Sequence, residues 1–366
     1  MIRSSAARRP SARTMRTLRR DHQRSAPLLA ALLALCALIA GCGFGTDGGG
    51  GGESEPETEG ITLYSGRIAA ALGGANDAYE ADTDTDVEVR YAASADLGAQ
   101  IVEEGENSPA DAFFAQEFPA MGAVEDAGLL AELPDDILEM VPPEYRDPEG
   151  RWVGVTGRAR TVAYNSDVLS PADLPENPLD FTDPEWEGRV GWSPITGSFQ
   201  EYMTQVRLAY GDAAARDFLE GMVANGVTAY PNNVALRDAI ANGEVDAGLI
   251  NHYYVAQAIA AEDEDYPVKL FFPKQGLGST VLLTTIGVLD GSDRKDEAFD
   301  YVRFMLNDES QSFFTTSSKE YPLVAGVERD PSLELPLAKI PAPPSEPLDL
   351  AELQKTVELM QETGAL

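Results

Sequence analysis

The chain has almost no cysteine or histidine, although thiolate and imidazole are common metal ligands and catalytic groups. Only two of its 366 residues are cysteines and only two are histidines. Cys36 lies within an apolar N-terminal run and Cys42 follows that run, so the chain beyond residue 42 has no thiol and no disulfide. His252 is the single histidine outside the N-terminal region. This composition excludes a cysteine nucleophile.

Familiar catalytic motifs are also missing. The sequence contains no G-x-S-x-G elbow, Walker loop or H-E-x-x-H helix, and no glycine fingerprint for a dinucleotide between an expected strand and an expected helix. Carboxylates are abundant, but on a chain this acidic they are typical of a solvated surface. We therefore expect a protein that is not an enzyme.

Basic side chains are scarce as well. The chain carries 27 basic and 61 acidic residues, which gives a formal net charge of −34. Eight arginines and one aspartate lie in residues 1–41, and without that segment the net charge is −41. Such a surface repels nucleic acid and anionic lipid headgroups, so we expect no nucleic-acid partner.

Residues 1–41 have the pattern of a secretion signal. A basic region precedes an apolar segment from about Ala26 to Ala40, which is too short for a comfortable transmembrane span. The stretch LIAGC (38–42) resembles a bacterial lipobox, with Cys42 as the lipidated first residue of the mature chain. The alternative is a plain secretory signal with an incidental cysteine. We expect an extracytoplasmic protein that a lipid anchors to the cell membrane.

The basic region is long for a signal. Met15 gives a more ordinary signal than Met1, so the true start codon stays open. The tract that follows, GFGTDGGGGGESEPETEG (43–60), cannot bury a core. It predicts a flexible tether over residues 42–60.

Strand-like and helical segments alternate from residue 61 onward, which predicts an α/β fold with mostly parallel sheets flanked by helices. The expected strands of the first part are ITLYSG (61–66), DVEVRYA (86–92) and ADAFFAQ (110–116). Those of the second part are RVGWSP (189–194), TAYPN (228–232) and VDAGLIN (245–251). Ligands of such sheets lie beyond the carboxyl ends of the strands.

Two adjacent tyrosines, Tyr253 and Tyr254, follow the last of these strands, where a helix is expected to begin. Tyrosines beside a strand usually pack in a core. Here Asn251 and His252 put polar groups between the strand and the phenols, and a helix N-terminus favours phenolate over phenol. The pair is therefore a candidate ligand site.

Two other strand-to-helix turns carry similar polar chemistry. Thr196, Gly197 and Ser198 lie at one helix start, and Asn232 and Asn233 at another. Helix capping explains either turn alone, but hydroxyls, glycine and free helix N–H groups together suit an oxyanion. Two phenolates beside an oxyanion suggest a hard cation, and ferric iron is the natural candidate. The alternative is a solute-binding protein for a phosphonate or small carboxylate, without metal.

These motifs resemble the periplasmic ferric-ion-binding proteins that supply ABC importers. The resemblance covers roughly residues 61–325 and rests on ITLYSGR, SPADAFFAQE, WVGVTGRARTVAYN, GRVGWSPITGSFQ, NNVALRDAIANGEVDAGLINHYY and KEYPL. It implies a monomer that binds Fe³⁺ through Tyr253 and Tyr254 and passes it to a permease. It also implies a pocket for a synergistic anion made by Thr196, Gly197, Ser198, Asn232 and Asn251.

This chain departs from the family pattern at three positions. Many members have a histidine where this chain has Ile68 and a glutamate where it has Gln116, and some have a third tyrosine where it has Phe199. Two phenolates leave one charge of Fe³⁺ uncompensated, so an exogenous anion is expected to be required. Glu117 is the alternative, because its carboxylate could rotate in as a ligand.

The resemblance implies carbonate or phosphate as that anion. Other members use the arginine of the YSGR turn to hold carbonate, which here is Arg67, with Arg158 or Arg160 in support. The simpler reading of all three arginines is surface ion pairing. Phosphate is the second choice, held by the hydroxyl and amide side chains of the anion pocket.

The predicted architecture is a two-lobe binding protein of the type II periplasmic kind. The N-terminal lobe is expected over 61–157 plus 284–325. The C-terminal lobe is expected over 158–283 plus 326–366, which includes a last amphipathic helix. Two chain crossings near GRARTVAYN and LLTTIGVLD would form the hinge.

Overall fold

The structure is a computed structural model that describes residues 60–262, 265–342 and 350–366. The predicted signal, Cys42 and all of the predicted tether except Gly60 lie outside these residues. No helix in the described ranges is both long and apolar enough to cross a membrane.

The strands follow the alternating pattern of the sequence. They are β1 (Ile61–Ser65), β2 (Val87–Tyr91), β3 (Ala112–Ala115), β4 (Val153–Asn165), β5 (Val190–Trp192), β6 (Thr228–Ala229), β7 (Ala247–Asn251), β8 (Val268–Phe271), β9 (Thr280–Val288) and β10 (Tyr321–Pro322).

Helices connect and cover these strands. They are α1 (Ala69–Thr83), α2 (Ser94–Glu104), α3 (Phe118–Asp126), α4 (Asp135–Leu138), α5 (Gly197–Tyr210), α6 (Asp212–Ala224), α7 (Asn233–Ala241), α8 (His252–Glu262), α9 (Lys295–Met305), α10 (Asp308–Phe313) and α11 (Leu350–Glu362).

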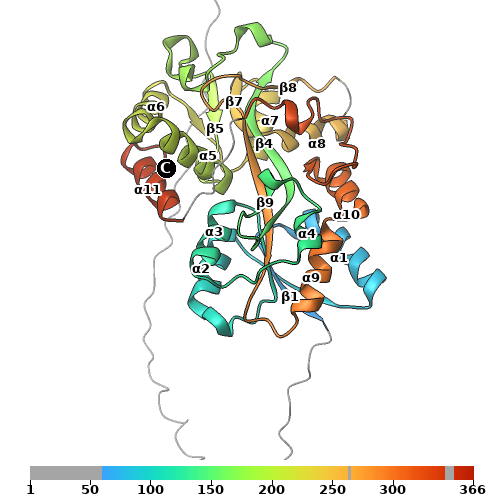
Figure 1. The fold of residues 1–366 in the computed structure, drawn as a ribbon. Coiled ribbons are helices and arrows are strands. Elements are labelled where there is room, and N and C mark those ends of the chain that lie inside the picture. The colour runs from blue at the N-terminus through green and yellow to red at the C-terminus, as the bar shows by residue number, and fades with distance from the viewer. Residues whose placement is uncertain (1–59, 263–264, 343–349) are drawn as a thin grey trace, which may run out of the picture. The chain divides into compact units, whose positions relative to one another are not determined.

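Two parallel groups of strands are joined through two long strands. The order is β2-β1-β3-β9-β4-β7-β5-β6, and β8 and β10 also pair with β4. β1 is parallel to β2 and β3, and β5 is parallel to β6 and β7. We call β1–β3 with α1–α3 the first lobe, and β5–β7 with α5–α8 the second lobe. Figure 1 shows β4 and β9 running from one group of elements to the other.

β4 is the element that reaches both lobes. Its first part, Val153–Arg160, pairs antiparallel with β9, with a shift of register between Gly154 and Thr156. Its last part, Arg160–Tyr164, pairs with β7 of the second lobe. Because β4 and β9 run continuously through 157/158 and 283/284, the lobe boundaries proposed from the sequence stay predictions.

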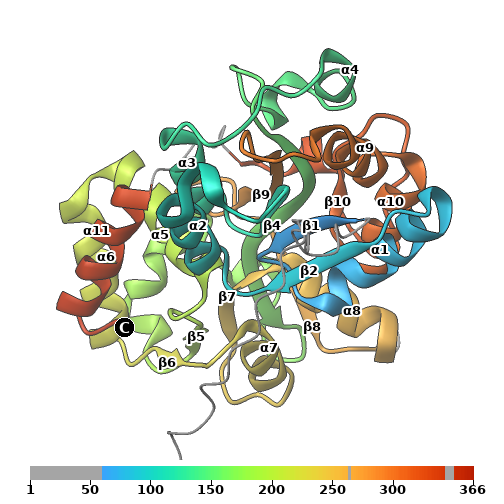
Figure 2. The ribbon, with the colours of Figure 1, turned by 90° about the horizontal axis from the view of Figure 1, so that it is seen from below.

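Each lobe has its own apolar cores, because its inner strands, β1 and β3 in the first lobe and β5 and β7 in the second, are almost entirely buried. The largest cluster of the first lobe includes Leu63 and Phe114, and that of the second includes Trp192 and Phe199. Helix α11 packs on α5 and α6 and also contacts α3. Figure 2 shows it beside α6.

Candidate functional site

The two tyrosines lie in the first turn of α8, which begins directly after β7 without a connecting loop. The sequence predicted that a strand ends and a helix begins at this point, and both residues are helical. Their ring centroids are 4.2 Å apart and the ring planes differ by 34°. Both side chains stay partly accessible. The two phenols are therefore neighbours at the carboxyl end of a buried strand.

Charge around Tyr253 acts in two directions. Burial, followed by the neighbouring Tyr254, raises the pKa of Tyr253 well above 10, and Arg158 opposes this rise. Arg158 is buried, and the carboxylates of Glu117 and Glu201 raise its pKa against the effect of desolvation. The phenol of Tyr253 is thus protonated at neutral pH.

His252 is a structural residue rather than a ligand. It is fully buried, and its Nδ1 accepts the Ala159 N–H at 3.0 Å. Its Nε2 lies 2.9 Å from the Lys319 carbonyl, so Nε2 carries the proton. Its ring stacks on Tyr321 at 4.7 Å. Burial lowers the pKa of His252 to about 4, which keeps the imidazole neutral and both nitrogens occupied.

Arg160 joins two turns that the sequence assigned to one anion pocket. Its Nη1 lies 3.2 Å from Asn251 Oδ1 and 3.4 Å from Ser198 Oγ, and its Nη2 donates to the Leu249 carbonyl at 2.9 Å. Burial lowers its pKa to about 10. Phe199 lies under the guanidinium, 5.0 Å from its carbon to the ring centroid. Phe199, where some relatives have a tyrosine, thus makes a cation–π contact with Arg160.

The N-terminus of α5 meets a carboxylate from the first lobe. A Cβ placed on Gly197 would lie only 3.2 Å from Cδ and 3.3 Å from Oε1 of Glu117. Ser94 Oγ donates to Glu117 Oε2 at 2.9 Å. Thr196 turns its own hydroxyl to the Ser193 carbonyl at 2.7 Å. Glu117 therefore reaches the turn assigned to the anion.

Asn232 makes no hydrogen bond to the other candidate residues in the described chain. It is exposed and caps α7, accepting the Ala235 N–H at 2.9 Å. Its neighbour Asn233 is 2% exposed, and its buried Oδ1 has no partner among the described residues. Capping is thus the observed role of Asn232, while Asn233 has the unused acceptor.

Arg67 is buried in the first lobe beside the β4 crossing. Its Nη1 donates to Glu320 at 2.9 Å and to Thr156 Oγ1 at 3.4 Å. Its Nε and Nη2 are buried and have no partner among the described residues. It is no surface ion pair, because Glu320 is only 2% exposed. One planar edge of the guanidinium is thus unused.

Arg158 on β4 and Glu201 on α5 are two further buried charged residues. Arg158 Nη2 donates to the Gln116 carbonyl. Glu201 was not singled out in the sequence. It is 2% exposed, and burial raises its pKa to about 8 although Arg158 lowers it. No sequence signal separates this glutamate from the other 60 acidic residues.

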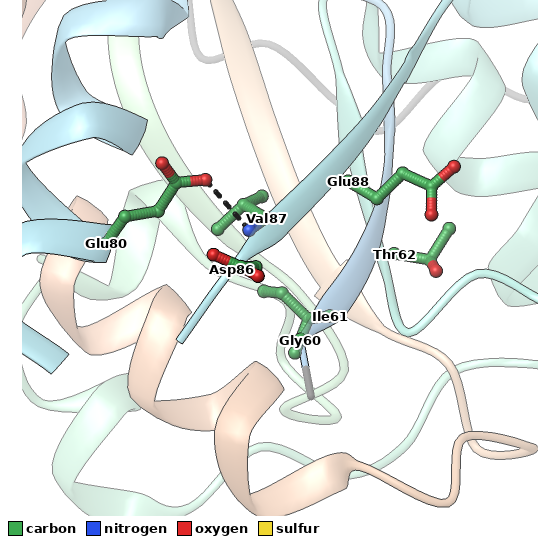
Figure 3. Close-up of a pocket in the computed structure, with 7 residues that line it drawn as sticks. All are labelled: Gly60, Ile61, Thr62, Glu80, Asp86, Val87 and Glu88. Atoms are coloured by element: carbon green, nitrogen blue, oxygen red, sulfur yellow. Dashed lines mark hydrogen bonds between the residues drawn. The ribbon is translucent and has the colours of Figure 1, made fainter. Parts of the chain in front are cut away.

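A separate hollow of about 290 Å³ lies at the opposite end of the first lobe's strands. It is lined by Gly60, Ile61, Thr62, Glu80, Asp86, Val87 and Glu88. In Figure 3 the Glu80 carboxylate turns to the Val87 N–H, which it accepts at 2.9 Å. In the described chain no cluster of three His, Cys, Asp or Glu side chains is arranged to hold a metal. A metal at the tyrosine pair would depend on phenol oxygens instead.

Known proteins resemble this chain in sequence. A family model of bacterial extracellular solute-binding proteins matches residues 101–340. The Fe(3+)-binding periplasmic protein of Serratia marcescens is 34% identical over 321 residues, which cover 86% of this chain and 94% of that protein.

The fold of this chain also resembles those of solved structures. Iron-bound HitA from Pseudomonas aeruginosa matches with a TM-score of 0.77 and 35% identity, covering 83% of this chain and 99% of that one. The Trichodesmium protein IdiA (FutA), in complex with iron and citrate, matches with a TM-score of 0.69 and 26% identity, covering 83% and 99%. These matches confirm the predicted two-lobe α/β fold.

Proposed function

This chain belongs to the bacterial extracellular solute-binding protein family, and from that premise we propose that it captures ferric iron outside the cytoplasm for an ABC importer. The observation that carries the proposal is the tyrosine pair at the start of α8, with ring centroids 4.2 Å apart. Phenolate oxygen is a hard donor that suits Fe³⁺. Arg158 favours the ionised form of Tyr253.

A synergistic anion supplies the charge that two phenolates leave uncompensated. Carbonate is our first choice, because a planar oxyanion matches a guanidinium edge. Supporting this choice, Nε and Nη2 of Arg67 and Nε of Arg158 and Arg160 are buried and have no hydrogen-bond partner within the described part of the chain. A buried N–H with no acceptor is costly, so an anion that accepts from it stabilises the site.

Phosphate is the second choice, and it would use the start of α5. Thr196, Gly197 and Ser198 lie there, and Arg160 links Ser198 to Asn251. The first N–H groups of a helix and its dipole favour an oxyanion. Asn232 would have to release its capping bond to α7 to take part.

The proposed role in iron import also implies the partners of the protein. We propose that the permease of an ABC importer receives the iron, that the protein acts as a monomer, and that a lipid on Cys42 holds it at the cell membrane. The iron relatives named above are the support for the first of these. The pattern LIAGC is the support for the last.

Absorption spectroscopy tests the proposal. Purified protein should develop a visible ferric–phenolate band on titration with ferric iron, with one equivalent at the end point. A protein that bound a phosphonate or small carboxylate directly would stay colourless while its heat of binding to that solute was measurable. A colourless, tight-binding result of that kind would replace the iron assignment.

The anion is tested in the same titration in buffer freed of carbonate and phosphate, with each then restored. Arg67→Lys keeps a cation beside Glu320 but loses the planar edge, so it should lose the carbonate effect and keep any phosphate effect. Full iron affinity in the stripped buffer would rule out the anion requirement. Equal carbonate dependence in both proteins would remove Arg67 from the site.

A further inference from the structure

Both candidate iron ligands belong to one lobe. Tyr253 and Tyr254 are on α8, whereas Ile68 of the first lobe has no ligating atom and is 70% exposed. A ligand shifts a conformational equilibrium only through its different affinities for the two states. Iron held by α8 alone would therefore do little to draw the lobes together, and another contact has to do so.

The first such contact runs from the first lobe to the second. Glu117 stands between β3 and α3, yet its carboxylate lies against Gly197 at the start of α5. A side chain at Gly197 would press on it, because an added Cβ would be 3.2 Å from Cδ, which is tighter than ordinary van der Waals contact. Ser94, at the start of α2, holds the other carboxylate oxygen at 2.9 Å. Glu117 is thus fixed by its own lobe and directed at the other.

The second contact runs in the opposite direction. Glu201 is one turn into α5, and the Phe118 backbone N–H at the start of α3 lowers the pKa of its carboxyl against the larger effect of burial, which places the two groups close to each other. It is 2% exposed, and its Oε2 has no partner among the described residues. The first N–H groups of a helix lack partners within the helix and attract a carboxylate.

The two contacts are reciprocal. Each lobe sends a carboxylate to the first turn of a helix in the other lobe, and the buried Arg158 lies within electrostatic reach of both. Arg158 also donates to the Gln116 carbonyl, directly before Glu117. An isolated buried carboxylate is costly, whereas a cation between two carboxylates offsets the cost of both.

We propose that Glu117 and Glu201 form a clasp that holds the two lobes together over the tyrosine pair and so controls how fast the iron is released. The part that concerns iron rests on the proposed function, whereas the clasp itself does not. Both glutamates are positioning residues that act through α3 and α5, not through the metal.

The test compares Glu117→Ala, Glu201→Ala and the double variant with wild type. Glu125→Ala is the matched control, because Glu125 is a partly buried carboxylate on α3 that bonds Trp152 Nε1 at 3.0 Å, within the first lobe. The corresponding Gln variants keep the side-chain volume if an alanine variant folds poorly. Hydrogen exchange is measured by mass spectrometry at the first amides of α3 and of α5, without iron.

A clasp predicts that each single substitution speeds exchange at both helix starts, because the lobes separate together. A local cap would change only the helix that the removed carboxylate faces, and that result would overturn the proposal. The Glu125 control should change neither helix start. Exchange unchanged in the double variant would likewise refute the clasp.

A second measurement follows loss of the visible band after excess chelator is added to the iron-loaded proteins. We expect each single variant to lose iron about tenfold faster, since charged contacts to helix starts are worth roughly this factor. The band position should not move. A shifted band in Glu117→Ala would make Glu117 an iron ligand and overturn its role in the clasp. If wild type gave no band, the proposed function would fail while the exchange data still decided the clasp.

Discussion

At the scale of single residues, the sequence could reveal candidate site residues that are neighbours in the chain. Two tyrosines after a buried strand stand out in the printed chain, and the structure keeps their rings 4.2 Å apart. Glu201 carried no such signal, since its partner Phe118 is far away in the sequence. Arg67 was predicted to hold an anion, but its bond to Glu320 spans 253 positions and only folding reveals it.

The tyrosine pair leads to a prediction about pH. Burial raises the pKa of Tyr253, so its phenol is protonated in the iron-free protein at neutral pH and iron must displace the proton. The affinity for iron should therefore fall as pH falls, by about tenfold per unit for each proton released.

Tyr253→Phe and Tyr254→Phe supply the controls for this pH dependence. Each should abolish most of the visible band and remove about one proton from the slope of affinity against pH. Iron competition with a calibrated chelator between pH 5 and pH 8 measures both quantities. If both variants kept the wild-type band and slope, the metal would lie elsewhere.

At the scale of elements, the sequence predicted the order of strands and helices better than their ends. β7 was expected to end before the tyrosines and a helix to begin at them, but α8 begins earlier, at His252. The reason is tertiary: His252 is bonded to Ala159 of β4 and to Lys319, which fixes the start of α8 against two distant segments. The expected strand TAYPN shortened to two residues, because Pro231 has no N–H to donate to a sheet and Asn232 already caps α7.

The same histidine gives a prediction about stability. The pKa of His252 is lowered to about 4 by burial, against about 6.5 in an unfolded chain. Between these values the unfolded chain binds a proton that the folded chain does not. The contribution of His252 to the free energy of unfolding is therefore at its full value above about pH 6.5. It falls by roughly 3 kcal/mol in all as the pH drops toward 4.

Urea unfolding of iron-free wild type and His252→Gln at pH 7, 5.5 and 4 measures this loss. Glutamine does not titrate, so the difference in unfolding free energy between the two proteins isolates His252 from the many carboxylates. That difference should shrink steadily toward pH 4. A difference that stayed constant across the three pH values would show that the buried imidazole is not held neutral.

At the scale of the whole molecule, two lobes could be predicted but their limits could not. The alternating pattern predicted most of the strands but not β8 or β10. The predicted two-lobe architecture implied that the chain crosses between lobes twice. The pattern does not show where β4 passes from β9 to β7, because its thirteen residues are all buried and form one long extended stretch in the sequence. The clasp between α3 and α5 was equally hidden, since each half of it looks like an ordinary helix start.

The N-terminal region gives the last prediction, which concerns where the whole molecule resides. LIAGC predicts a lipid on Cys42, and the glycine-rich tract up to residue 60 predicts a flexible connection to β1. All candidate ligands lie beyond this tether. Cys42→Ser should therefore move the protein from the membrane fraction to the soluble fraction while its iron affinity changes less than about twofold, well below the tenfold step of 1.4 kcal/mol. Mass spectrometry of the membrane-extracted wild type should find a diacylglyceryl group on Cys42. A mature N-terminus elsewhere, or a soluble wild type, would refute the anchor, and a large loss of affinity in Cys42→Ser would place part of the tether at the site.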